Sequence, residues 1–433
     1  MTTTSAKAVN SPEIIRLQRR TLIVLSVAQV VSGIGVAVGL ALSALVVTRM
    51  SGSEAIGGLA GTAAVLGAAL LAIPVARAGA RSGRRAGLIL AYGVATLGAV
   101  ISVLAIQAGW WPLLLGGLVL LGGGSAGNLA ARYSAADLAP PGAAARHLSL
   151  VIWATTVGSV TGPNLAEPAD RAGTALGLAV NAGGFALAAV MYLISTVVIA
   201  AALRPDPLHV ARSLDAAADT GGKSGGTAAA GRGGGTVRTG WQVLRESRTA
   251  RRAITAIAVS HTAMVSIMSM TPVHLDHGGA TISVIGVVIS LHIAGMYVLS
   301  PVVGWLADRI GRVPVLLLGM GQLLAAAALA GSAGAHGVPQ VAVGLTLLGT
   351  GWSCGLVAGS AMLTESAPAE RRPAVQGMSD MLMNVCGAGG TVIAGMIVGS
   401  FSYGVLGAAV AVLVAATAAW LALPGRRAHL ASA

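Results

Sequence analysis

Long apolar stretches separated by short polar loops recur along the whole chain. Each is long enough to cross a hydrocarbon core of about 30 Å, which takes about 20 residues of helix. The apolar run that begins at Thr21 is longer than a signal-peptide core and has no convincing cleavage site, so we interpret it as the first span. The pattern predicts twelve spans, at residues 21–46, 55–76, 86–107, 112–133, 147–166, 177–203, 253–272, 281–303, 313–331, 338–361, 374–398 and 403–424.

The composition supports this pattern and narrows the class of protein. Of the 433 residues, 55% are hydrophobic and only 9% are charged, which excludes an ordinary soluble domain. Cys354 and Cys386 fall inside predicted spans, where small-residue packing is the expected role, although either thiol could act as a soft ligand. We find no CxxC, no HExxH and no nucleophile–base pattern. We therefore predict an all-α membrane protein that is not an enzyme and has no cofactor.

The basic residues indicate the orientation in the membrane. Lys and Arg are retained on the cytoplasmic side in short loops. With twelve spans and a cytoplasmic N-terminus, only Arg49 and Arg171 of the 27 Lys and Arg residues fall outside. We expect a plasma-membrane protein with both termini in the cytoplasm. The net charge of +13 has the same origin, so we expect contacts with anionic lipids and no binding of nucleic acid.

A segment rich in Gly, Ala, Ser and Thr divides the chain into two parts. Residues 204–252 are expected to form a flexible cytoplasmic linker between an N-terminal half, 1–203, and a C-terminal half, 253–433. Four sequence pairs match between the halves at a constant offset of 228 residues: Gly83-Arg84 with Gly311-Arg312, Gly127 with Gly355, Asp137 with Glu365, and Pro140 with Pro368. One offset through several loops and spans indicates duplication, and parallel six-span repeats are typical of secondary transporters.

A loop motif in the C-terminal half carries a family resemblance. The run Gly304-Trp305-Leu306-Ala307-Asp308-Arg309-Ile310-Gly311-Arg312 resembles the loop between the second and third spans of a major facilitator superfamily half. The resemblance implies that superfamily's fold, with twelve helices in two six-helix halves. In the N-terminal copy Ala80 replaces the expected Asp, so a gate based on Asp308, Arg309, Gly311 and Arg312 would rest on the C-terminal copy. The alternative is a solvated turn with topology-setting arginines.

Four side chains on consecutive predicted spans suit a soft metal ion. Met264 and Met268 are four residues apart, as are His292 and Met296, and residues at this spacing share one helix face. Thioether and imidazole groups together suit Cu(I). At 1.5 Å per residue, Met264 and His292 fall near the membrane midplane, with Met268 nearer the outside and Met296 nearer the cytoplasm. The alternatives are adaptable core packing for the methionines and a single carbonyl hydrogen bond for the histidine.

These two motifs resemble those of the CcoA-like copper importers of bacteria, a branch of the same superfamily. The resemblance implies copper contacts at Met264, Met268, His292 and Met296, import of copper as the transported substrate, in the form Cu(I), and supply of cytoplasmic copper for cuproenzymes. A cytoplasmic copper chaperone is then a possible partner. Two further hypotheses stay open: an exporter of small organic compounds, which Gly158-x-x-x-Gly162-Pro163 in the fifth span favours weakly, and a membrane sensor that binds metal without transporting it.

Other polar side chains near this path are secondary candidates. His261 lies one turn from Met264, and Met270 lies nearer the external end of that span. The turn that follows carries His274, Asp276 and His277, which could collect a cation or form a solvated turn. Asp380 is the clearest acidic residue within a predicted span, and it could carry a coupling proton or pair with nearby arginines.

Overall fold

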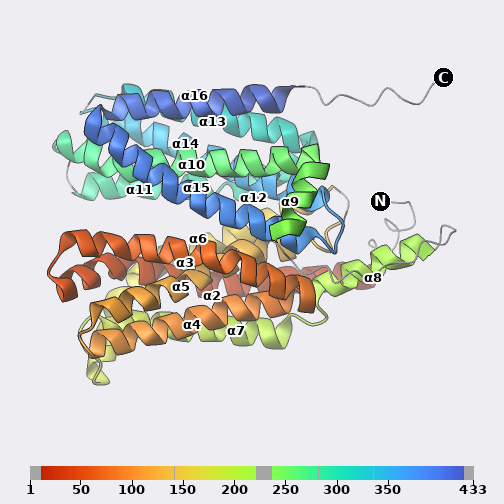
Figure 1. The fold of residues 1–433 in the computed structure, drawn as a ribbon, viewed down its shortest axis with the longest axis horizontal. Helices are drawn as coiled ribbons and strands as arrows, with labels where there is room; N and C mark the ends of the chain where they lie inside the picture. Colours follow the sequence, from red (N-terminus) through yellow and green to blue (C-terminus); the bar gives the residue numbers. More distant parts are fainter. Residues whose placement is uncertain (1–10, 141, 221–236, 281, 335, 424–433) are drawn as a thin grey trace.

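Fifteen α-helices and no β-strands make up the described part of the computed structural model, which comprises residues 11–140, 142–220, 237–280, 282–334 and 336–423. Six helices form the N-terminal half: α2 (Pro12–Ser51), α3 (Glu54–Ser82), α4 (Arg84–Gln107), α5 (Trp111–Ser134), α6 (Ala144–Ala175) and α7 (Ala182–Ala202). Seven form the C-terminal half: α10 (Arg248–His277), α11 (Ile282–Tyr297), α12 (Ser300–Ile310), α13 (Arg312–Ser332), α14 (Val338–Glu365), α15 (Arg372–Ser400) and α16 (Tyr403–Ala422). Figure 1 shows the two halves as two bundles lying side by side.

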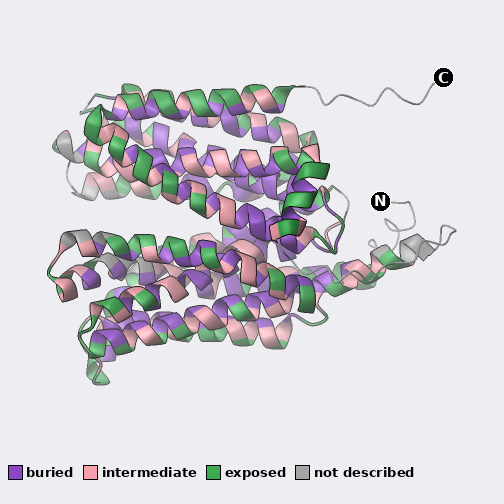
Figure 2. Ribbon diagram, viewed as in Figure 1, coloured by how far each residue is buried: buried purple, intermediate pink, exposed green. Residues whose placement is uncertain are grey.

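Eleven helices in the described residues are long and apolar enough to span a membrane. The predicted span 147–166 lies within α6, a continuous helix of 32 residues whose second half carries the polar residues Asn164, Glu167, Asp170 and Arg171. The predicted span 281–303 is divided between α11 and α12. Large apolar side chains are exposed on the outer helix faces of both halves, as lipid contact requires (Figure 2).

The described part of the connecting segment is mainly helical, whereas the sequence predicts a flexible linker there. Helices α8 (Pro207–Thr220) and α9 (Val237–Glu246) flank residues 221–236, which lie outside the described residues. Helix α9 buries Val243 and Leu244 against the C-terminal half, and the Asp206 carboxylate before α8 accepts a hydrogen bond of 2.8 Å from the backbone N–H of Arg85. Both helices are therefore anchored to the bundle. They lie at one end of it, which we call the linker face (Figure 1).

The two halves meet near the linker face, through two contacts related by the repeat. Helix α6 packs on α12 at Ser149 and Gly304, and α3 packs on α15 at Ala76 and Gly377. Adding 228 to Ala76 and Ser149 gives 304 and 377, so the same repeat positions make both contacts. A Cβ added at Gly304 or Gly377 would overlap the facing helix. The absence of a side chain at these two positions therefore allows the helices to approach closely.

The repeated loop turns on a glycine in each half. Gly83 has φ 88° and Gly311 has φ 98°, in the left-handed region that other residues rarely adopt. Each glycine ends one helix and starts the next, α3 to α4 and α12 to α13. The glycine of the loop motif is thus required by the backbone, whatever the role of its charged neighbours.

Candidate functional site

A central cavity of about 460 Å³ lies between the two halves. Its wall is mainly apolar, and the polar groups come from both halves. The residues that line it include Gln29, Asn128, Arg132 and Thr155 from the N-terminal half, and His261, Met264, Met296, Tyr297, Trp352, Met383 and Asn384 from the C-terminal half. A cavity enclosed by two repeats, with its polar groups held on helices, is the expected position of a transporter's substrate site.

Two of the four motif residues line this cavity. Met264 of α10 and Met296 of α11 are 4% and 7% exposed, and both contribute to its wall. Met268 is half-buried and His292 is fully buried, and neither is among the described residues that line it. Helix α11 packs mainly on α14, and α10 packs on both α14 and α15, so α14 contacts both motif helices.

The helix bounds place the four groups at two levels. Helix α10 continues to His277, five residues beyond the predicted end of that span. Counted from the helix ends opposite the linker face, Met268 and His292 lie about 14–15 Å deep, and Met264 and Met296 about 20–21 Å deep. The expected staggered ladder is therefore better described as two pairs, of which the deeper pair lines the cavity.

The hydrogen bond of His292 determines which of its ring nitrogens is available. Nδ1 lies 2.8 Å from the carbonyl oxygen of Leu345 in α14. Because a carbonyl oxygen can only accept, Nδ1 carries the proton and Nε2 presents a lone pair in the neutral ring. Nε2 is buried and has no hydrogen-bond partner within the described part of the chain. A backbone carbonyl on one nitrogen and a free lone pair on the other is the usual arrangement of a metal-binding histidine.

His261 has the opposite arrangement. The indole Nε1 of Trp352 donates to His261 Nδ1 at 3.1 Å, so the proton of the neutral imidazole is on Nε2. Trp352 also contacts the Tyr297 ring edge-on, with centroids 5.8 Å apart. His261 is among the residues that line the cavity, and it could ligate a metal through Nδ1 only by giving up the Trp352 bond.

Met270 and His274 are not among the described residues that line the cavity. Met270 is half-buried, and the His274 ring stacks on Tyr403 with centroids 4.4 Å apart. The backbone of Asp276 and His277 belongs to α10, but their side chains lie outside the described residues. Within the described residues, no three His, Cys, Asp or Glu side chains form a metal-binding group.

A buried ion pair joins the two halves on the linker-face side of the cavity. Arg132 Nη2 of α5 donates to Asp380 Oδ1 of α15 at 2.6 Å, and the two side chains are 2% and 5% exposed. The same guanidinium lies over the Tyr133 ring, 4.6 Å from its centroid. Its Nε and Nη1 have no partner among the described residues. Asp380 is thus paired with an arginine of the other half, and that arginine is among the residues that line the cavity.

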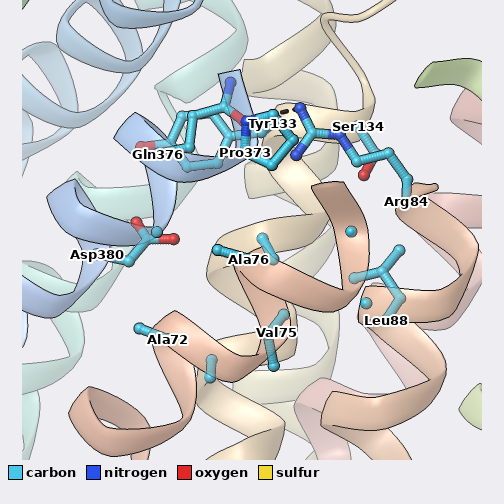
Figure 3. Close-up of a pocket in the computed structure, with 15 residues that line it drawn as sticks. Ala72, Val75, Ala76, Arg84, Leu88, Tyr133, Ser134, Pro373, Gln376 and Asp380 are labelled. Carbon is cyan, nitrogen blue, oxygen red and sulfur yellow. Dashed lines mark hydrogen bonds between the residues drawn. The ribbon is translucent and has the colours of Figure 1, made fainter. Parts of the chain in front are cut away.

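A second polar contact between the halves lies closer to the linker face. Arg84 donates to both oxygens of Asp137, at 2.6 and 3.0 Å, and to Gln376 of α15 at 2.7 Å. Figure 3 shows Arg84 and Gln376 reaching toward each other across a small cavity, with Asp380 farther along α15. These groups and the Arg132 pair close the linker-face side of the central cavity.

Asp308 connects the C-terminal half to the first turn of α6. Its carboxylate accepts the backbone N–H groups of Ala145 and Arg146, at 3.1 and 2.9 Å, and pairs with Arg312 at 2.7 Å. Arg312 also pairs with Glu365 of its own half, whereas Arg309 lies over the Trp305 ring. A carboxylate at a helix N-terminus is stabilised both by the unpaired N–H groups and by the helix dipole.

The N-terminal copy lacks this connection for a reason visible on both sides of the interface. The residue equivalent to Asp308 is Ala80, and the residue equivalent to Ala145 is Pro373. Proline has no N–H to donate, so a carboxylate at position 80 would lose one of its two acceptor bonds. The contact through Arg84 and Gln376 occurs in its place.

Sequence reasoning did not identify Arg132, Gln376 or Trp352 as parts of the site. From the sequence alone, Arg132 is included only among the basic residues assigned to the cytoplasmic side, and Asp137 and Glu365 only as a repeat pair. The signal was present, since an arginine and an aspartate inside two predicted spans need partners. Which residue pairs with which depends on how the halves meet.

The architecture defines a class: a membrane transporter whose two repeated halves enclose a central cavity. The model of the Major Facilitator Superfamily matches residues 25–280 and 253–432, and the chain belongs to this family. The predicted fold class and the predicted absence of enzyme activity are both confirmed by this membership.

Similar proteins extend over nearly the whole chain. The uncharacterized MFS-type transporter YdeG of Bacillus subtilis (strain 168) is 36% identical over 396 residues, covering 91% of this chain and 90% of its own. The riboflavin transporter RfnT of Brucella anthropi is 26% identical over 367 residues, 84% of this chain and 85% of its own. Among solved structures, the human organic anion transporter MFSD10 has a TM-score of 0.74 at 14% identity, covering 93% of this chain and 99% of its own, which shows the shared fold.

Proposed function

We propose that this secondary transporter carries copper, as Cu(I), across the bacterial plasma membrane into the cytoplasm. In this proposal the linker face is cytoplasmic, as the distribution of basic residues indicates. The copper would supply cuproenzyme assembly, and a cytoplasmic copper chaperone would be its natural acceptor. The copper ion is the transported substrate, so no resident cofactor is needed.

The unpartnered Nε2 of His292 is the observation that carries the proposal. A buried imidazole nitrogen without a hydrogen bond costs free energy, and a ligand that uses its lone pair would recover that cost. The Leu345 carbonyl already holds the ring in the tautomer that a metal requires. A hydrogen-bond donor of a solute could also bind to Nε2. We propose a metal instead because of the neighbouring thioethers.

Thioethers lie one helix turn from this histidine and on the wall of the central cavity. Met296 lies one turn from His292 on the same face of α11, and Met264 and Met383 line the cavity from α10 and α15. Sulfur ligands with one imidazole favour Cu(I) over Zn²⁺ or Mn²⁺, which prefer imidazole or oxygen ligands. The two levels of ligands provide successive weak sites, which an ion must be able to leave as readily as it enters.

The polar contacts between the halves suggest how the cycle proceeds. They lie on the linker-face side of the cavity, so this conformation is closed toward the cytoplasm in the proposed orientation. Release of copper requires the bonds made by Asp308, Arg84 and Arg132 to break as the halves rock. We propose Asp380 as the coupling group, because a proton on its carboxyl would remove the charge that pairs with Arg132.

Binding of Cu(I) to the purified protein tests the proposal. The protein in detergent, kept reduced and anaerobic, would compete with a coloured Cu(I) chelator of known affinity. His292→Asn keeps an amide donor for the Leu345 carbonyl but removes the second ring nitrogen, and we expect it to weaken Cu(I) binding at least tenfold. Met320→Leu, at a fully buried methionine of α13, is the matched control for Met264→Leu and Met296→Leu. Equal affinity in His292→Asn and the parent would contradict the ligand assignment.

A second candidate is transport of a small organic compound, either as import or as export. The cavity of about 460 Å³ far exceeds one ion, and its wall includes the rings of Trp352 and Tyr297, which suit a planar polar solute. The similarity to RfnT makes riboflavin the first compound to test. Uptake of labelled riboflavin by cells that express this chain, unchanged by His292→Asn and lost on Trp352→Ala, would favour this candidate over copper.

A further inference from the structure

An apolar groove on the outer surface of the N-terminal half lies between α2 and α6, separate from the central cavity. Its volume is about 570 Å³. On α2 its residues follow a helical spacing of three and four, and on α6 they repeat the same spacing. They are Arg19, Leu22, Ile23, Ser26, Val27, Val30 and Val31 on α2, and Leu150, Trp153 and Ala154 on α6. A continuous face on each helix therefore forms one side of the groove.

Positive charge is concentrated at one end of this groove. Arg19 lines it near the linker face, and Arg146 lies one turn before Leu150 on the same face of α6. Both arginines are exposed. Their neighbours Gln18 and His147 contact each other, with Gln18 Nε2 2.9 Å from His147 Nδ1, and this contact holds the two helix ends together. The nearby Asp308 carboxylate is already engaged by Arg312 and by two backbone N–H groups.

The groove has the length of one lipid leaflet. From Arg19 to Val31 is twelve residues, or about 18 Å of helix. Half of a hydrocarbon core of about 30 Å is about 15 Å, so the apolar part spans the depth of one leaflet. The exposed side chains along it, Ile23, Val27, Leu150 and Trp153, are 57%, 46%, 38% and 43% exposed. An acyl chain would cover them without displacing any polar contact.

We propose that this groove is a binding site for an anionic phospholipid. The phosphate lies between Arg19 and Arg146, and one acyl chain follows the groove toward Val31. A guanidinium on each side suits a phosphodiester, because planar paired N–H donors match phosphate oxygens. The inference does not depend on the transported substrate.

Native mass spectrometry of delipidated protein tests this site. The protein in detergent would be titrated with dioleoyl phosphatidylglycerol or with dioleoyl phosphatidylcholine, which differs only in its headgroup. We expect one tightly retained phosphatidylglycerol. Arg19→Gln with Arg146→Gln should weaken its retention on the order of 30-fold, since each basic residue near an anionic lipid contributes roughly a factor of five. Arg238→Gln, at an exposed arginine of the linker helix α9, which packs on the C-terminal half, should leave it unchanged.

A second variant tests the groove independently of the charge. Ser26→Trp places a large ring in the middle of the groove while both arginines remain, and we expect it to abolish tight retention. Equal retention of phosphatidylcholine and phosphatidylglycerol would show an apolar groove without headgroup recognition and overturn the proposal. Equal retention by the parent and by either groove variant would do the same. Copper binding should be unchanged in all these variants, so the two proposals fail separately.

Discussion

Replacing Asp308 by Asn should open the linker face. The carboxylate accepts two backbone N–H groups of α6 and carries the negative charge at that helix's N-terminus. Asn keeps one acceptor oxygen and loses the charge. A hydrogen bond to a charged group contributes about 1.5–3 kcal/mol, and an anion at a helix N-terminus about 0.3–1 kcal/mol. A loss of about 2 kcal/mol from the closed state changes the equilibrium between the closed and open states roughly 30-fold. If the closed state holds about 97% of the molecules in the parent, it would hold about half of them in the variant.

Double electron–electron resonance, which measures the distance between two spin labels, would detect this shift. Spin labels at Arg81→Cys and Glu370→Cys occupy exposed positions, one in each half, in a background with Cys354→Ala and Cys386→Ala. We expect a longer distance to appear in Asp308→Asn and to account for about half of the signal.

Glu365→Gln is the matched control. Glu365 pairs with the same Arg312, but it does so within the C-terminal half, and its side chain is 45% exposed. We expect its distance distribution to resemble the parent's, since an exposed ion pair contributes about 0–1 kcal/mol. An unchanged distribution in Asp308→Asn, or an equal shift in Glu365→Gln, would refute the assignment of Asp308 as the connection between halves.

Two further changes test the packing between the halves. Asp380→Asn removes the counter-charge of buried Arg132, and breaking a buried pair in this way costs about 3–5 kcal/mol. The melting temperature in detergent should therefore fall, and it should recover when Arg132→Met is added. An unchanged melting temperature in Asp380→Asn would contradict this. Gly304→Leu places a side chain against Ser149 and should shift the spin-label distances to the open state, whereas Gly321→Leu, where a Cβ meets nothing within 4 Å, should not.

The sequence was sufficient for the fold because its strongest signals are local. Apolar runs of about 20 residues locate spans without knowledge of their neighbours, and the 228-residue offset identifies the duplication. The polar second half of α6 and the short helices α8 and α9 were harder to predict. Their stability depends on packing against the bundle, as the burial of Val243 and Leu244 shows, more than on their own composition.

The candidate site could be predicted only in part, for a related reason. The spacing of the Met and His motifs is a property of single helices, but the cavity is formed where the halves meet. The partner of Asp380 lies 248 residues away in the chain, and the free nitrogen of His292 depends on a carbonyl of α14. A single sequence shows that such buried polar groups need partners, but it does not show which residues supply them.

Accumulation of labelled copper by intact cells tests the central claim most directly. Cells lacking their own copper importer would express the parent, His292→Asn, Met264→Leu or the Met320→Leu control, at equal amounts of protein in the membrane. We predict copper uptake by the parent and by Met320→Leu, and near-background uptake by the other two variants, with excess zinc failing to compete. Uptake by His292→Asn and Met264→Leu at the parent rate, or a parent strain that accumulates less copper than cells without the protein, would contradict the account.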